Sequence, residues 1–448
     1  MRIPKRPKPM SDLLTELGPR LGDIVSAGLS RLSEDRYLHW DVLRYKPVPG
    51  EFTAEEWWMA IKLARASSLK LLPFTDQEGR PFQFSMPPPV LRMLHLVDRD
   101  ASGRIEVPES ITNSQTRDRF LVRSLIEEAI TSSQLEGAAT TRKDAKEMLR
   151  AGRKPRTRDE QMIFNNYRAM EFIRENYTSP LTPRLILDLQ TILTTDTLDD
   201  PSGAGRWRRD DENIRVVDAR DETVLHVPPP ANQLHDRVDR LCAFANPGED
   251  EPFIHPVIRS ILIHFMIGFD HPFVDGNGRT ARALFYWSMA RHGYWLMEFV
   301  SISAILRKAP SKYARSYLYT ETDENDATYF VIYQLDVIVR AIKSMHEYLA
   351  SKAAEVREAD TWLRNSSALR ALLNHRQVAL VQHALKHPYE AYTVRSHMIS
   401  HHVTYETART DLLQLAEQSL LEKTMRGRAY LFVVPPDLQD RLSAVAKA

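Results

Sequence analysis

Apolar residues recur three or four positions apart along most of the chain, which is the spacing of amphipathic helices and predicts a mainly α-helical protein. The first hundred residues contain two such patterns around a proline-rich break. The second pattern covers 53–66, where Thr53 precedes a pair of glutamates, as at many helix starts. We expect Trp57 and Trp58 to fill a core, because large aromatic side chains mostly do so. The first pattern consists of Leu13, Leu14, Leu17, Leu21 and Ile24.

Between residues 120 and 348 one predicted helix follows another, with one interruption. Two short runs rich in β-branched residues, 214–217 and 223–226, flank a polar turn and predict an isolated β-hairpin. Two strands alone are marginally stable in water, so we expect this hairpin to lean on the helices or to serve a partner. Its first strand consists of Ile214, Arg215, Val216 and Val217.

The last hundred residues differ in character. A charged helix over 351–363 precedes further helical patterns, one of which begins near Thr404, and then a hairpin with Gly427 between two arginines at its tip. Two helices followed by a glycine-tipped hairpin are typical of a winged helix-turn-helix. The polar stretch 98–116 has the character of a linker. We therefore expect an N-terminal helical module over 1–112, a helical core over 113–350 and a C-terminal winged helix over 351–448.

Composition narrows the class of protein. The 448 residues include 60 Lys and Arg against 59 Asp and Glu, and this net charge of +1 excludes a strongly basic nucleic-acid coat. Cys242 is the only cysteine, so no intrachain disulfide can form. No stretch approaches the ~20 apolar residues of a membrane span, and the basic N-terminus lacks the apolar segment of a secretory signal. We expect a cytoplasmic protein without membrane contact.

The most informative segment is 271–282, which reads His-Pro-Phe-Val-Asp-Gly-Asn-Gly-Arg-Thr-Ala-Arg. Gly276 and Gly278 flank Asn277, so the backbone can turn sharply and present successive N–H groups. A strong helical pattern follows directly. A glycine-rich loop that leads into a helix N-terminus predicts an anion-binding cradle.

Charged and titratable side chains surround this cradle. Arg279 and Arg282 are three residues apart and project from one face of the first helical turn, where they suit phosphate oxygens. Asp275 is a hard oxygen donor that suits Mg²⁺ when phosphates supply the other ligands. His271 can accept a proton near neutral pH. Each feature alone is more typical of a simple turn, but together and in this order they indicate phosphoryl or nucleotidyl transfer.

The same twelve residues resemble the signature of the Fic domain, His-Pro-Phe-x-Asp/Glu-Gly-Asn-Gly-Arg-x-x-Arg, at every fixed position. The resemblance implies a helical Fic core with a β-hairpin flap, and transfer of AMP from Mg²⁺-bound ATP to a Ser, Thr or Tyr hydroxyl of a target protein. The flap at 214–217 would hold a target segment by strand addition. His271 would be the catalytic base and Asp275 the Mg²⁺ ligand. The nucleotide would be bound by Gly276, by Asn277 near the α-phosphate, by Gly278, and by Arg279 and Arg282 at the β- and γ-phosphates.

A second motif lies upstream, at the end of the helix predicted over 120–137. Ser132, Glu136 and Gly137 fit the pattern Ser/Thr-x-x-x-Glu-Gly/Asn, and Gly137 is a natural C-cap. Alone, this pattern is typical of a helix end with a solvated glutamate. Beside a Fic core it resembles the inhibitory motif of class II members. The resemblance implies that Glu136 pairs with Arg282, occupies the site of the γ-phosphate and inhibits transfer.

Two functions from different classes stay open. One is an autoinhibited protein adenylyltransferase, with AMP removal or phosphotransfer by the same core as variants. The other is a DNA-binding regulator whose core senses nucleotide with little turnover. Residues 395–430 hold five Lys or Arg and four Asp or Glu, which gives nucleic-acid binding weak support. A homodimer and self-modification also stay open, the latter because Tyr313, Tyr317 and Tyr319 lie in the same core.

Overall fold

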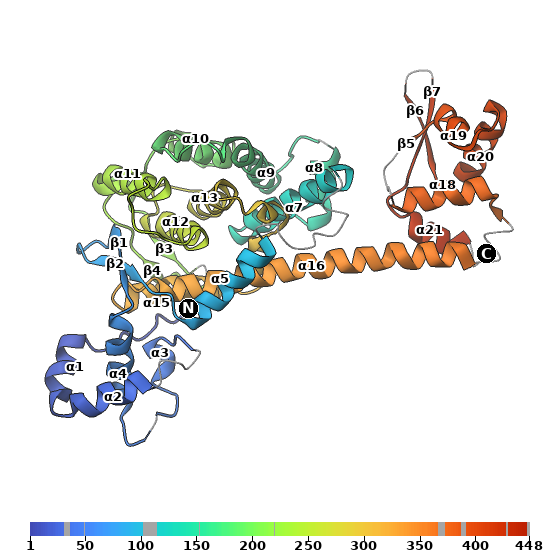
Figure 1. Cartoon of the computed structure of the whole chain (residues 1–448). Helices are drawn as coiled ribbons and strands as arrows, with labels where there is room; N and C mark the ends of the chain where they lie inside the picture. The colour runs from blue at the N-terminus through green and yellow to red at the C-terminus, as the bar shows by residue number, and fades with distance from the viewer. Residues whose placement is uncertain are drawn as a thin grey trace. The chain divides into compact units, whose positions relative to one another are not determined.

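The computed structural model describes residues 1–30, 36–48, 50–101, 114–151, 153–218, 220–365, 372–386, 391–426 and 429–445 (Figure 1). Most of this part of the chain is helical and its strands form small sheets, so the prediction of a mainly α-helical protein is confirmed. The chain divides into two compact units, 1–345 and 346–448, and the division falls inside helix α16 (Thr328–Asn365). Within the described ranges, no helix combines the length and the apolar character that a membrane span requires.

The first unit begins with a small helical module and a hairpin. Thr53 caps α4 in a reciprocal capping box with Glu56, and Trp57 and Trp58 lie in the module's core as predicted. The hairpin was not predicted, because each of its strands contains a proline that weakens the strand pattern. These elements are α1 (Met10–Leu17), α2 (Leu21–Ser30), α3 (Trp40–Leu43), α4 (Ala54–Ala66), β1 (Lys70–Thr75), β2 (Pro81–Phe84) and α5 (Pro88–Ala101).

The predicted linker at 98–116 is helical at both of its ends. Helix α5 continues to Ala101 and α7 begins at Ser114, while 102–113, with the expected domain boundary at 112/113, lie outside the described residues. Arg99 is exposed on the last turn of α5, so polar sequence here marks the solvent face of a helix. The helices that follow are α7 (Ser114–Leu135), α8 (Arg142–Ala151), α9 (Arg158–Asn176), α10 (Pro183–Thr194), α11 (Leu234–Ala245), α12 (Pro256–Asp270), α13 (Asn277–Arg291), α14 (Ile302–Leu306) and α15 (Pro310–Thr322).

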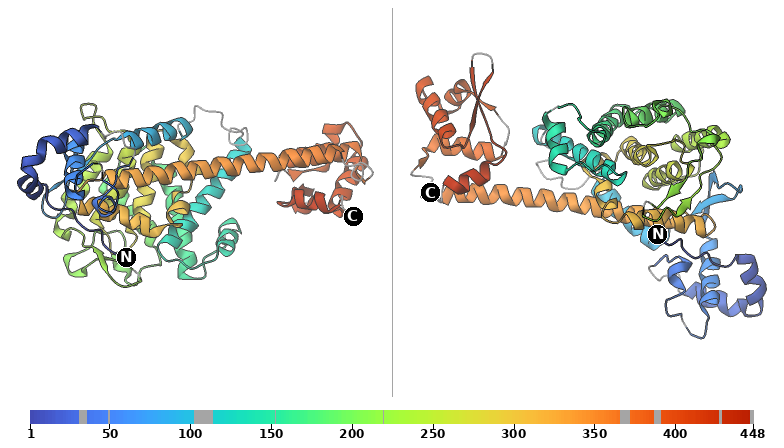
Figure 2. Two further views of the ribbon diagram at one scale, coloured as in Figure 1. Left: turned by 90° about the horizontal axis from the view of Figure 1, so that it is seen from below. Right: turned by 180° about the vertical axis from the view of Figure 1, so that it is seen from behind.

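Helices α12 and α13 form the centre of the first unit and pack along each other (Figure 2). Nearly every side chain of α12 is buried, because its sequence is apolar on all sides. Helices α7, α9 and α10 pack against α13, and α11 packs against α12. The loop between α12 and α13, residues 271–276, is therefore held by two buried helices.

The predicted β-hairpin is present but shorter than expected. It consists of β3 (Val216–Val217) and the antiparallel β4 (Val224–His226). Ile214 and Arg215 precede the first strand, so their assignment to it is wrong. A 3₁₀ turn over 210–212 and the left-handed Asn213 come directly before them, and the chain becomes extended enough to pair only at β3.

The second unit has its own hydrophobic core. Helix α20 begins after Thr404, which caps it at the predicted position, and the predicted hairpin appears as β6 and β7. Gly427 and Arg428 of the predicted tip lie outside the described residues, and the charged helix predicted at 351–363 is the C-terminal part of α16. The elements are α18 (His375–Lys386), β5 (Ala391–Tyr392), α19 (Val394–His401), α20 (Tyr405–Glu417), β6 (Glu422–Arg426), β7 (Ala429–Val433) and α21 (Leu438–Val445), with sheet order β5-β7-β6.

Candidate active site

The loop between α12 and α13 is built from two residues in the left-handed region. His271 ends α12 with φ of 45°, and Gly276 precedes α13 with φ of 85°. A glycine reaches this conformation at no steric cost. A histidine rarely adopts it, and non-glycine residues in this conformation are concentrated at functional sites. The loop between these two turns brings a histidine, an aspartate and a helix N-terminus into one small region.

The imidazole of His271 is held in one tautomer. Its Nδ1 lies 2.9 Å from the carbonyl oxygen of Gly268, which can only accept a hydrogen bond, so Nδ1 carries the proton. Nε2 is therefore left with a free lone pair. Burial lowers the pKa of His271 to about 4, and the nearby His226 and Arg208 also lower it, against the hydrogen bond to Gly268, which raises it. His271 is neutral at physiological pH and can accept a proton at Nε2.

The side chain of Asn277 closes the loop instead of facing outward. Its Oδ1 accepts from the backbone N–H of Phe273 at 2.9 Å, and its Nδ2 donates to the carbonyl of Phe273 at 2.8 Å. Asn277 is 4% exposed. The Asn277 side chain fixes the shape of the loop by pairing with the backbone groups of Phe273. Any contact of Asn277 with an anion would therefore come from the backbone N–H of Asn277.

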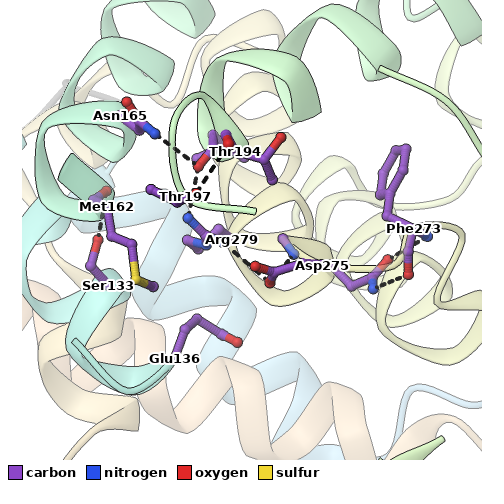
Figure 3. Close-up of polar contacts among 12 residues, drawn as sticks. Ser133, Glu136, Met162, Asn165, Thr194, Thr197, Phe273, Asp275 and Arg279 are labelled. Atoms are coloured by element: carbon purple, nitrogen blue, oxygen red, sulfur yellow. Dashed lines mark hydrogen bonds and ion pairs between the residues drawn. The ribbon is translucent and has the colours of Figure 1, made fainter. Parts of the chain in front are cut away.

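Arg279 is tied to the loop and to α10. It donates to the carbonyl of Leu193 at 2.7 Å and to Asp275 at 3.2 Å, and it is 1% exposed. Figure 3 shows Arg279 between Asp275 and the end of α10. Its Nε is buried and has no hydrogen-bond partner among the described residues.

Arg282, three residues further along α13, contacts α7 instead. Its Nε donates to the Ser132 hydroxyl at 2.9 Å, and its Nη2 donates to Glu136 at 2.8 Å and to the Ser132 carbonyl at 3.1 Å. Arg282 is 1% exposed, and its Nη1 has no hydrogen-bond partner among the described residues. The two arginines thus leave the same helical turn toward different neighbours.

Glu136 lies directly over the N-terminal turn of α13. A Cβ added to Gly278 would be 2.2 Å from the Glu136 Oε1, so a larger residue at 278 would require this carboxylate to shift. Gly137, with φ of 100°, turns the chain away just after α7 ends, as a C-cap glycine does. Figure 3 shows Glu136 extending from the end of α7 toward the loop that carries Asp275.

Two buried polar residues that sequence reasoning did not assign to the site also hold this loop. Arg208 donates from Nε to the carbonyl of His271 at 2.7 Å, and its own backbone N–H donates to the carbonyl of Pro272 at 2.9 Å. Gln190 accepts from the backbone N–H of Gly205 at 2.6 Å and donates to the carbonyl of Asp275 at 3.3 Å. Neither lies in a recognisable motif, so no local pattern could have found them.

Comparison with known proteins identifies the class of this core. Residues 180–289 match the model of the Fic/DOC family. The protein adenylyltransferase Fic of Drosophila virilis is 35% identical over 95 residues, which are 21% of this chain and 18% of that protein. The protein of the same name from Drosophila mojavensis is 29% identical over 134 residues, 29% of this chain and 25% of that protein. The chain thus spans a quarter or less of these curated relatives.

Among solved structures, a Fic family protein from Desulfovibrio desulfuricans G20 shares the fold. Its TM-score is 0.51 at 18% identity, and the match covers 81% of this chain and 99% of that chain. The chain therefore contains a Fic domain, as its motif predicted. The loop from His271 to Arg282 lies inside the matched segment, whereas Glu136 lies before it.

Proposed function

We propose that this protein is an adenylyltransferase that moves AMP from ATP to a Ser, Thr or Tyr hydroxyl of a target protein. The observation that carries the proposal is the tautomer of His271. A neutral imidazole with its lone pair free stands beside a glycine-rich helix N-terminus and two buried arginines. The curated relatives named protein adenylyltransferase Fic support the same activity.

The reaction would proceed by displacement at the α-phosphorus of ATP. His271 Nε2 takes the proton of the target hydroxyl as its oxygen forms a bond to the α-phosphorus. The bond from that phosphorus to the bridging oxygen breaks, and pyrophosphate leaves with the electron pair. Backbone N–H groups near Gly276 and Gly278 would bind phosphate oxygens, and Arg282 would bind the terminal phosphates. The chain thus supplies a base, an anion cradle and fixed positive charge.

The donors present fit a magnesium ion that binds together with nucleotide. Asp275 has its carboxylate 43% exposed at the edge of the cradle. The described residues contain no cluster of three or more His, Cys, Asp or Glu side chains that could hold a metal alone. Magnesium commonly binds through one or two carboxylates plus phosphates and water, which matches this set. When bound, Mg²⁺ would neutralise charge on the phosphates and help to orient them.

We further propose that α7 is an inhibitory helix. The Glu136 carboxylate lies on Arg282 and over Gly278, where it would repel the terminal phosphates and block their approach. A small displacement of the α-phosphate from in-line geometry is sufficient to slow transfer, since about 1 Å can cost about a hundredfold in rate. Ser132 would hold Arg282 in place from the same helix.

The hairpin of β3 and β4 would be the flap that holds the target. The described strand β3 pairs with β4 alone, which leaves its outer edge available for an added strand. Its base adjoins the site, because the loop before it contacts His271 and Pro272 through Arg208. Self-modification at Tyr313 is less favoured than an external target, since its hydroxyl is engaged with His264 at 2.7 Å.

In this proposal the protein has three parts and is cytoplasmic. The second unit has two helices, α19 and α20, followed by the β6–β7 hairpin, which is the order of a winged helix-turn-helix. The N-terminal module would serve packing or dimer formation. A regulator that binds DNA and transfers little AMP is the competing function, and its winged helix would then contact nucleic acid.

Intact-protein mass spectrometry after incubation with ATP and Mg²⁺ tests the activity. We would compare wild type, Glu136→Gly, and Glu136→Gly combined with His271→Ala, each alone and with a cell lysate supplied with ATP labelled at its α-phosphate. We expect AMP on the protein or on a lysate protein with Glu136→Gly, and none with the double variant. If Glu136→Gly modifies neither itself nor any lysate protein, the adenylyltransferase function is wrong and the regulator is favoured.

A further inference from the structure

A buried histidine joins the flap to the helix that ends at His271. His226 is the last residue of β4, and its side chain is 9% exposed. Its Nδ1 lies 2.8 Å from Oε2 of Glu321 on α15, and its Nε2 lies 2.7 Å from the carbonyl oxygen of Phe269 on α12. One side chain thus connects three elements that are far apart in the sequence.

The partners of His226 define its protonation state. A backbone carbonyl and a carboxylate both accept hydrogen bonds, so for both contacts to be hydrogen bonds at once both ring nitrogens must carry a proton. A neutral imidazole has only one N–H and would lose one of these contacts. The geometry therefore describes a buried imidazolium paired with Glu321.

The charges around this ring favour the cation on balance. Burial lowers the pKa of His226, but the hydrogen bond and charge of Glu321, the Phe269 carbonyl and the neighbouring Asp270 together raise it above the ordinary value. Asp270 is itself bound by Arg237 on α11 at 2.7 Å. Arg208, which contacts the carbonyl of Asp270, and His271 are further charged or titratable neighbours.

The contact at Phe269 lies close to the groups that orient His271. The carbonyl of Gly268, one residue earlier, accepts the hydrogen bond from His271 Nδ1. Arg208 binds the carbonyls of Asp270 and His271 on the other side. His226 therefore holds the end of α12 at the point that sets the direction of the His271 ring, and holds β4 of the flap with it.

We propose that His226, as an imidazolium paired with Glu321, is a positioning residue that fixes the flap and the His271 ring relative to each other. This inference rests on the proposed AMP transfer. It adds a pH dependence. The two hydrogen bonds of His226 to Glu321 and Phe269 form a tether that is complete below the pKa of His226, and one of them is lost as the pH rises through this pKa. Transfer should therefore fall on the alkaline side, where His271 itself stays neutral and active.

The kinetic test measures AMP transfer against pH in the Glu136→Gly background. His226→Gln should lower transfer about ten- to a hundredfold at neutral pH and abolish the alkaline decline, because the glutamine cannot carry the charge. Glu321→Gln should move the midpoint of the decline to lower pH by about one unit, since it removes the neighbouring negative charge. His235→Gln, an exposed histidine on α11, is the matched control and should leave the profile unchanged. An alkaline midpoint that Glu321→Gln does not move would overturn the proposal.

A second measurement separates this tether from the proposed activity. In protein with carbon-13-labelled histidine and without ATP, the ring signal missing from His226→Gln identifies His226 in the NMR spectrum. Its titration midpoint should lie above 6.5 in the wild type and fall in Glu321→Gln. A midpoint at or below 6.5 would overturn the imidazolium tether whether or not AMP is transferred. A midpoint above 6.5, with no AMP transfer by Glu136→Gly, would leave the tether standing and refute the adenylyltransferase function.

Discussion

Removal of the Glu136 carboxylate should activate the enzyme and weaken its resting structure at the same time. The pair with Arg282 joins a side chain that is 1% exposed to one that is 31% exposed, over 2.8 Å. Without Glu136, Arg282 keeps both contacts to Ser132, so its charge is not left entirely unpaired. We therefore expect a loss of about 1–3 kcal/mol, the usual cost of an unsatisfied buried group, instead of the larger cost of breaking a fully buried ion pair.

The expected results of Glu136→Gly follow from the same contact. The melting temperature without ligand should fall, and AMP transfer should rise about a hundredfold if the carboxylate misplaces the α-phosphate by about 1 Å. ATP should now stabilise the variant more than the wild type, and at a hundred times the Kd it would contribute about 2.7 kcal/mol. Thermal shift with and without Mg·ATP, together with AMP incorporation, measures all three effects.

A charge-matched pair of variants isolates the carboxylate. Glu136→Gln removes one negative charge directly after α7, and Glu127→Gln removes one from α7 itself, where Glu127 pairs with Arg142, which is 58% exposed. An exposed pair of this kind contributes about 0–1 kcal/mol, so Glu127→Gln should change neither ATP binding nor transfer. If Glu136→Gln activates transfer no more than Glu127→Gln does, the Glu136 carboxylate is not the inhibitory group.

Three further predictions concern the base, the metal ligand and the second unit. Because the pKa of His271 is about 4, the acid limb of kcat/KM should have its midpoint near pH 4, and a midpoint near 6.5 would refute the buried neutral base. Asp275→Asn should raise the Mg²⁺ concentration for half-maximal transfer by more than about tenfold, because loss of even an outer-sphere partner lowers metal affinity by about 10–100-fold. An unchanged dependence of transfer on Mg²⁺ concentration would show that Asp275 is not a metal ligand. Asp411→Asn should destabilise the second unit by about 1–3 kcal/mol, because Asp411 is 3% exposed and bound to Arg376 at 2.7 Å while Arg376 itself is 19% exposed, and AMP transfer by the core should be retained. Circular dichroism melting checks this, and an unchanged unfolding profile would show that the pair is dispensable.

The parts of the fold that could be predicted from sequence are those that depend on near neighbours. Helix α4 was predictable because its capping box spans only four residues, and the anion loop because its glycines and helix start are contiguous. The strand assignment of Ile214 and Arg215 failed, since a left-handed Asn213 just before them overrides their β propensity. Local pattern was informative wherever the interactions that decide the structure were themselves local.

The missed residues act through long-range contacts with backbone atoms. Arg208 binds carbonyls 62 and 63 residues away, and Gln190 binds one 85 residues away. A carbonyl is present at every position, so such a contact leaves no complementary residue type in the sequence. Glu136 and Arg282, 146 residues apart, can be paired from the sequence only because both belong to motifs that resemble those of one family.

The four charged side chains of the resting site balance one another, and this balance suggests how one carboxylate would control nucleotide binding in the proposed function. Arg279 is paired with Asp275, and Arg282 with Glu136, so two positive charges face two negative ones. In the proposed function a triphosphate would have to displace Glu136, because its carboxylate and the terminal phosphate would compete for the same guanidinium. Arg279 Nε and Arg282 Nη1, both buried without a partner among the described residues, are donors that the carboxylate leaves unsatisfied. A ligand with several oxygens could satisfy donors that a single carboxylate does not, so the same arginines can favour the inhibitory glutamate at rest and the nucleotide once Glu136 has moved.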